Sequence, residues 1–174
     1  YSKLQEIEKN LDKVWPDGKN ERKLIETIWK LLLHSDDEEI KSKIINYVDS
    51  NSMTLAKAAL NSFSRINCPE RKIISNIFFD KWKNNSVVLD SWFSFNASIE
   101  TNNKTRGIEK LFENKLFDSK SPNTLRAILN TFVTRNSTFH AINGSGYKYI
   151  AKKIIEFDKL NPIVISRFVK VFSR

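Results

Sequence analysis

The segment S-P-N-T-L-R-A-I-L-N-T-F-V-T-R, residues 121–135, decides the fold class. Its apolar residues recur at i, i+3, i+4, i+7 and i+8, and they are Leu125, Ile128, Leu129, Phe132 and Val133. With about 3.6 residues per turn, this spacing places them on one side of an α-helix. Ser121 can cap this helix, and Pro122 suits the first helical position because its missing N–H has no helical partner there. The segment therefore predicts an amphipathic helix over residues 122–134.

The same helical period runs through most of the chain, and no sustained alternation typical of β-strands occurs. Further apolar stripes are Leu24, Ile25, Ile28, Leu31 and Leu32; Ile40, Ile44, Ile45 and Val48; Tyr147, Ile150, Ala151, Ile154 and Ile155; and Val164, Phe168, Val171 and Phe172. Two groups of residues mark helix starts: the pair Asn161-Pro162, and the set Asn67, Pro69 and Glu70. The acidic residues 36–39 suit a helix N-terminus. The expected helices are 2–14, 20–34, 37–49, 53–65, 69–83, 87–99, 104–115, 122–134, 145–159 and 162–173.

Many short helices with short connectors predict a specific architecture. A helical bundle would use fewer and longer helices, so stacked antiparallel pairs are favoured. Such stacking is typical of α-solenoids of the HEAT or armadillo kind. We expect an all-α fold in which helical hairpins form a short superhelical stack, with residues 1–174 as a single domain.

Composition excludes several other classes. The 174 residues include 40% hydrophobic residues, too many for a disordered chain, and only 4 Gly and 4 Pro, too few for an all-β fold rich in turns. The single cysteine, Cys68, excludes an internal disulfide and any zinc finger. The apolar runs are too short for a membrane span, and no signal peptide is recognisable. A soluble, intracellular domain is expected.

Motifs for chemistry are absent from the sequence. His34 and His140 are the only histidines, and no H-E-x-x-H, P-loop or G-x-S-x-G pattern occurs. We expect Cys68 to be an inert thiol and His140 to have a structural role. We also expect Trp82, Trp92 and Phe93 to be core residues, since aromatic side chains at helical spacing more often form cores than base-stacking platforms.

The net charge of +9 leaves two interpretations open. Lysines and arginines are interleaved with acidic residues, and no run of five basic residues exists. This distribution favours an ordinary solvated surface. A free-standing basic helical-repeat module that binds nucleic acid or protein remains the alternative, although a nucleic-acid partner is not expected.

Three clusters of residues, in this order and at these spacings, resemble one family. They are Met53-Thr54, Asp80-Lys81-Trp82, Asn85, Val88, Asp90, Trp92-Phe93 and Ala97; then Ser121-Pro122-Asn123 and Arg126; and then Phe139-His140-Ala141, Gly144-Ser145-Gly146-Tyr147, Asn161-Pro162 and Ser166-Arg167. Together they resemble the C-terminal helical domain of bacterial aminopeptidase N, in the gluzincin family of zinc aminopeptidases. The resemblance is good over residues 53–174 and loose over 20–52, and residues 1–19 are not placed.

The resemblance implies a function that composition does not. The parent enzyme would remove N-terminal residues from peptides with a zinc ion held by an H-E-x-x-H helix and a distant Glu. Because those motifs are missing here, the chain is expected to be a fragment truncated at both ends, with no catalytic residue, no metal site and no activity of its own. In the family this domain is a curved bowl that covers the catalytic domain of the same polypeptide and controls access of peptides. A cytoplasmic location is expected.

Two residues match family arginines that line the internal cavity. Arg167 lies in the Asn161-Pro162 to Ser166-Arg167 cluster, and Arg126 follows Ser121-Pro122-Asn123. The resemblance implies that both bind peptide substrates. An arginine at the border of an apolar stripe can bury its stem and present its guanidinium to a carboxylate. The alternative for each is an ordinary surface or structural arginine.

Overall fold

The computed structural model describes residues 2–11, 18–35, 37–99 and 105–173. These residues form ten α-helices and three short 3-10 helices, and no β-strand occurs among them. The expected all-α fold class is therefore confirmed. The expected helix 2–14 is described only up to residue 11, and Asp36 of the acidic run 36–39 lies outside the described residues.

The chain consists of two compact units, residues 1–88 and 89–174. The division falls inside helix α6 (Ser86–Ala97). Each unit has its own buried apolar side chains, such as Trp29 and Phe78 in the first and Phe132 and Ile150 in the second. The two units are described separately below.

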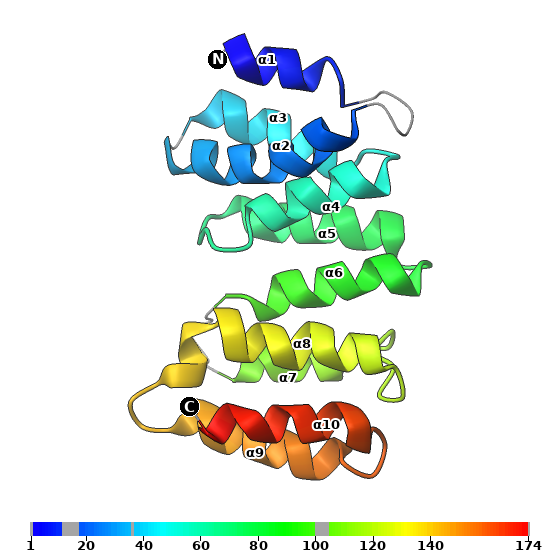
Figure 1. The fold of residues 1–174 in the computed structure, drawn as a ribbon, viewed down its shortest axis with the longest axis vertical. Coiled ribbons are helices and arrows are strands. Elements are labelled where there is room, and N and C mark those ends of the chain that lie inside the picture. Colours follow the sequence, from blue (N-terminus) through cyan, green and yellow to red (C-terminus); the bar gives the residue numbers. More distant parts are fainter. Residues whose placement is uncertain (1, 12–17, 36, 100–104, 174) are drawn as a thin grey trace. The chain divides into compact units, whose positions relative to one another are not determined.

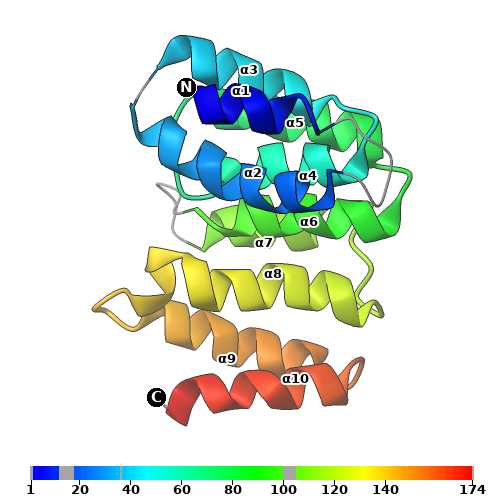
Figure 2. The same ribbon diagram turned by 45° about the horizontal axis from the view of Figure 1, so that its top comes forward.

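The first unit is a stack of helices in two layers. It contains α1 (Ser2–Glu8), α2 (Lys19–Leu32), the 3-10 turn η1 (Leu33–Ser35), α3 (Glu38–Val48), α4 (Met53–Ser62) and α5 (Glu70–Trp82). Helix α2 contacts α4, and α3 contacts α5, so alternate helices share a layer (Figures 1 and 2). This alternation is the arrangement expected of stacked helical hairpins.

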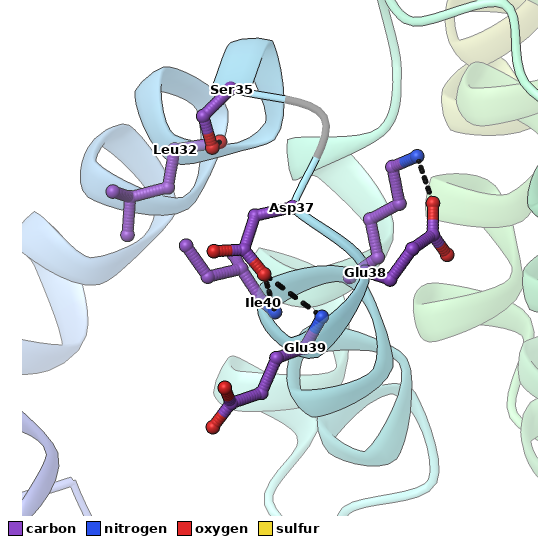
Figure 3. A network of polar contacts seen from close by, with 7 residues as sticks. Leu32, Ser35, Asp37, Glu38, Glu39 and Ile40 are labelled. Carbon is purple, nitrogen blue, oxygen red and sulfur yellow. Dashed lines mark hydrogen bonds and ion pairs between the residues drawn. The ribbon is translucent and has the colours of Figure 1, made fainter.

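Asp37 shows how local sequence fixes a helix start in this unit. Its carboxylate accepts hydrogen bonds from the backbone N–H groups of Glu39 at 2.9 Å and Ile40 at 3.2 Å (Figure 3). In the same turn Glu38 forms an ion pair with Lys41 at 2.8 Å. The cap satisfies N–H groups that have no helical partner, and the negative charge suits the positive end of the helix dipole.

The second unit contains the remaining helices. They are α6 from Leu89 onward, α7 (Arg106–Phe112), α8 (Pro122–Arg135), η2 (Ser137–His140), α9 (Ser145–Phe157), α10 (Pro162–Val169) and η3 (Lys170–Ser173). Helix α8 contacts both α7 and α10, and α10 contacts α9 (Figure 1). The Phe112 and Phe157 rings, with centroids 5.4 Å apart, join α7 to α9. Helices α8 and α10 thus belong to one layer, and α7 and α9 to the other.

The predicted apolar stripes agree with the buried faces in α3 and α8, but α2, α9 and the C-terminal stripe each expose predicted members. Leu24 and Leu31 of the α2 stripe and Phe172 of the last stripe are exposed, so the interpretation of these three as core residues was wrong. In α8, Leu125, Ile128, Leu129 and Phe132 are all buried. In α9 the stripe is rotated, because Ile155 is 76% exposed whereas Lys153 is 1% exposed. The interpretation of Ile155 as a core residue was therefore wrong. The reason is a set of partners for Lys153 that includes Glu109 and Phe112 of α7 and is described below.

The three aromatic residues that were expected in the core, Trp82, Trp92 and Phe93, differ in burial. Phe93 is 1% exposed, which confirms it as a core residue. Trp82 and Trp92 are intermediate in exposure, so neither is a fully buried core residue. Trp92 contacts the Phe93 ring edge to face, with centroids 5.2 Å apart. It therefore covers one side of the buried Phe93.

Candidate functional site

In the second unit, helix α8 runs parallel to the part of α6 that begins at Leu89, and these two N-terminal ends lie at one edge. Near their N-terminal ends, the buried Thr124 hydroxyl donates a hydrogen bond to the Asp90 carboxylate at 2.7 Å. Near their C-terminal ends, the buried Asn136 amide donates to the carbonyl oxygens of Ala97 at 3.1 Å and Ile99 at 2.8 Å. Contacts that join start to start and end to end fix both the direction and the register of the pair.

Helix α10 begins at this edge as well. The Asn161 side-chain amide donates to the carbonyl oxygen of Ser119 at 2.7 Å. Ser119 lies two residues before Ser121, whose Oγ caps α8 by accepting from the Thr124 N–H at 3.3 Å. The start of α10 is therefore tied to the start of α8, and both helices begin on the same side in Figure 1. Parallel helices that begin together direct the positive ends of their dipoles to one edge.

Arg126 lies in the second turn of α8, as its fifth residue. Its side chain is half-buried and donates a long hydrogen bond, 3.4 Å, to the amide oxygen of Asn123. This position lies between the buried stripe and the solvated face of the helix, as expected from the sequence.

Arg167 lies in the second turn of α10, as its sixth residue. It is exposed, and it lies next to the buried Phe168 and follows the buried Val164 by three residues. Its helix contacts α8. Neither Arg167 nor Arg126 forms an ion pair with another residue of the described ranges. The structure thus brings their helices together and leaves both charges available, whereas their orientation toward a concave surface stays a prediction.

A second cluster of charges, which sequence reasoning missed, joins α9 to α7. The Lys153 ammonium is buried and lies 2.9 Å from Glu109 and 3.0 Å from Glu156. It also lies over the Phe112 ring, 4.5 Å from the centroid. Tyr149 donates a hydrogen bond to the other Glu109 oxygen at 2.6 Å. Two carboxylates and an aromatic face compensate the buried charge, so the cluster acts as a structural link between the layers.

This cluster changes the acidity of its members. Partial burial opposes ionisation of Glu109, but hydrogen bonds from Tyr149 and Lys153, with the charges of Lys153 and Lys152, outweigh it and lower the pKa of Glu109. Burial, followed by the hydrogen bond to Glu109, raises the pKa of Tyr149 well above its ordinary value. Glu109 is thus held as a carboxylate and Tyr149 as a neutral phenol. Neither group is poised to exchange protons near neutral pH.

Cys68 and His140 have the surroundings expected of structural residues. Burial, and then a hydrogen bond with Glu70, raises the pKa of the Cys68 thiol, which keeps it protonated and poorly nucleophilic. Burial also lowers the pKa of neighbouring Arg71 to about 10, which still leaves it charged at neutral pH. His140 is exposed and shares a hydrogen bond of 2.9 Å between its Nδ1 and the Tyr147 hydroxyl.

The described residues offer no metal site. Within these ranges, no three His, Cys, Asp or Glu side chains lie close enough together to hold a metal ion. The zinc ion that the resemblance implies therefore has no ligand set in this part of the chain. Among the helices described, none is both long and apolar enough to cross a membrane.

Comparison with known families matches residues 2–174 to a domain of unknown function, DUF3458_C, described as ARM repeats. The chain belongs to this ARM-repeat family. The match extends across both compact units and confirms the expected helical-repeat fold.

Curated relatives of this ARM-repeat chain are aminopeptidases. Aminopeptidase N of Escherichia coli (strain K12) is 31% identical over 127 residues, which cover 72% of this chain and 15% of the relative. Aminopeptidase N of Haemophilus influenzae is 29% identical over 130 residues, with coverages of 74% and 15%. The resemblance to a domain of the aminopeptidase N family is confirmed. The chain spans about 15% of the length of these relatives.

A solved structure supports the same relationship. The crystal structure of Legionella pneumophila aminopeptidase A, in complex with aspartic acid, aligns with a TM-score of 0.82 and 27% sequence identity. The alignment covers 99% of this chain and 21% of that protein. The ARM-repeat chain is therefore similar in sequence and in structure to one part of larger aminopeptidases.

Proposed function

We propose that this ARM-repeat chain is the C-terminal capping domain of a zinc-dependent aminopeptidase that removes N-terminal residues from peptides. It covers the catalytic domain of the same polypeptide, encloses the active-site cavity and controls which substrates enter. The observation that carries the proposal is the alignment over 99% of this chain with one part of a solved aminopeptidase. In this proposal residues 1–174 act as one domain of a longer, cytoplasmic chain.

The proposal gives this domain no catalytic groups. The chemistry of a zinc-dependent aminopeptidase needs a metal ion, and no ligand set exists among the residues that the structure describes. Zinc would belong to the catalytic domain elsewhere in the polypeptide. The contribution of the helical repeats is enclosure, which excludes large folded substrates and restricts hydrolysis to peptides.

Arg126 and Arg167 bind the C-terminal carboxylate of the peptide in this proposal. Two features support the role. Both side chains carry charge without an ion-pair partner in the described ranges, and both lie in the second turns of neighbouring parallel helices. The positive ends of those helix dipoles add to the attraction for an anion. A guanidinium can form two parallel hydrogen bonds to one carboxylate, which fixes its orientation.

The full-length polypeptide that carries this domain tests the proposal. It should release the N-terminal residue from a short peptide, and it should act far more slowly on a folded protein that begins with the same residues. Equal rates on the two substrates would contradict the enclosure role, and no N-terminal release would contradict the enzymatic role. Salt-sensitive binding of DNA by residues 1–174 would instead support the basic binding module.

A further inference from the structure

We infer that Asn161 is a positioning residue, which sets the register of the two arginine-bearing helices and so holds Arg167 level with Arg126. The inference rests on the proposed function, because it assigns Asn161 a role in binding the carboxylate end of a peptide. In this role Asn161 touches no substrate and acts only by positioning α10.

The side chain of Asn161 does not cap α10, although Asn at an N-cap position usually does. Asn is among the preferred N-cap residues because its oxygen accepts from the first helical N–H groups. Asn161 occupies the N-cap of α10 but forms no side-chain capping bond. Its amide instead donates to the Ser119 carbonyl oxygen, 42 residues earlier in the chain, at 2.7 Å. The side chain is therefore used to connect segments rather than to cap a helix.

The backbone of Asn161 anchors it at the same time. Its N–H donates to the Phe157 carbonyl oxygen at the end of α9, at 2.9 Å. Its carbonyl oxygen accepts from Val164 at 3.1 Å and Ile165 at 3.0 Å, in the first turn of α10. One residue thus joins the end of α9, the start of α10 and the segment that leads into α8. A shift of Asn161 would move the start of α10 relative to α8.

Both arginines lie close to this junction along their helices. Arg126 is four residues into α8 from Pro122, about 6 Å along the axis, and Arg167 is five residues into α10 from Pro162, about 7.5 Å. The Asn161–Ser119 bond therefore sets the relative height of the two arginines from less than two turns away. Displacements of about 1 Å matter for groups that must meet one ligand together.

Asn136 provides a matched control. It is also a side-chain amide that bonds backbone carbonyl oxygens of another segment, but it lies at the far end of α8, ten residues beyond Arg126. It joins α8 to α6 rather than to α10. Loss of this contact should lower stability without changing the register between α8 and α10.

The test uses the full-length enzyme with two substrates. One is a dipeptide with a free C-terminal carboxylate, and the other is the same dipeptide with a C-terminal amide. The measured quantity is the ratio of the two kcat/KM values, which reports recognition of the free carboxylate. Asn161→Ser places another preferred N-cap residue at this position and adds no charge, but the serine side chain is too short to reach Ser119. This variant should lower the ratio by about threefold to tenfold, as expected for one weakened hydrogen bond. Asn136→Ser should lower the melting temperature and leave the ratio unchanged.

Three results would overturn the inference. The first is a wild-type ratio in Asn161→Ser while Arg167→Ala lowers it, which would leave the proposed function intact. The second is an equal loss in Asn136→Ser, which would make the effect one of general destabilisation. The third is a wild-type ratio in Arg167→Ala, which would contradict the role of the arginines themselves. Should Asn161→Ser fail to fold, Asn161→Ala takes its place with the same expected ratio.

Discussion

Gly146, near the start of α9, lies so close to Phe139 in η2 that a side chain at this position would overlap the Phe139 backbone. Gly144, two residues earlier, instead has open space around it, and its φ of 69° is in the left-handed region. The two glycines of the Gly144-Ser145-Gly146-Tyr147 segment are therefore required for different reasons. One permits close approach, and the other permits an unusual backbone conformation.

The two glycines should respond differently to alanine. Gly146→Ala forces backbone to move in a packed region and should cost about 3 kcal/mol of unfolding free energy. Gly144→Ala meets no neighbour and should cost only about 1 kcal/mol for the left-handed conformation. Urea denaturation of both variants measures the difference. Equal losses, or the reverse order, would contradict the close approach of η2 to α9.

The ion pair between Lys153 and Glu109 predicts a dependence of stability on pH. Because folding lowers the pKa of Glu109, its contribution is present above the ordinary carboxyl pKa and is lost as the pH falls through the folded value. Glu109→Gln should lower stability by about 1–3 kcal/mol near neutral pH, since the buried Lys153 loses a charged partner.

The same variant should also flatten the acid limb of the stability profile. Thermal melts between about pH 3 and 7 check this expectation, because ordinary carboxyl groups titrate in this range. Glu113→Gln, an exposed position just after α7, serves as the control. If both variants followed the wild-type profile, titration of Glu109 would not be the source of the pH dependence of stability.

Partial burial of Trp92 changes what its removal should do. The fully buried Phe93 should cost about 3–5 kcal/mol when replaced by Ala, the range for large aromatic side chains in cores. Trp92→Ala should cost less, because part of the Trp92 surface is already in water. Chemical denaturation of the two variants compares them directly. A larger loss of unfolding free energy for Trp92→Ala than for Phe93→Ala would contradict the partial burial of Trp92.

Residues 1–174 alone should neither bind zinc stoichiometrically nor hydrolyse an aminoacyl substrate. Two distant histidines and one cysteine give no ligand spacing. Metal analysis of the purified domain, with an alanyl reporter assay in the presence of added zinc, checks both statements. Metal-dependent hydrolysis by the domain alone would contradict the assignment of the chemistry to another part of the polypeptide.

Local patterns explain why the helices could be predicted from the sequence. Ser121 and Pro122 define the start of α8 through contacts within one turn, and the stripe from Leu125 to Phe132 needs only the helical period. Lys153 shows where this reasoning fails. A lysine counts as polar in any periodic pattern, and its partner Glu109 lies 44 residues away, so nothing in the local sequence indicates that it is buried.

The candidate site was predictable only in part for the same reason. The border positions of Arg126 and Arg167 follow from their own helices. The bond between Asn161 and Ser119 does not, because an Asn-Pro start predicts a capping role and gives no sign of a partner 42 residues earlier. Which surface of the stack the arginines face depends on how successive hairpins turn, and this is a property of long-range packing rather than of periodicity.

The central claim is that Arg167 and Arg126 receive the carboxylate end of a peptide. In the full-length enzyme, the kcat/KM for a dipeptide should be compared with that for its C-terminal amide. Arg167→Ala should lower the preference for the free carboxylate by roughly tenfold to a hundredfold, the equivalent of about 1.5–3 kcal/mol for a charge-assisted hydrogen bond. Arg135→Ala, an exposed arginine at the other end of α8, should leave the preference unchanged. A wild-type preference in both Arg167→Ala and Arg126→Ala would contradict the account.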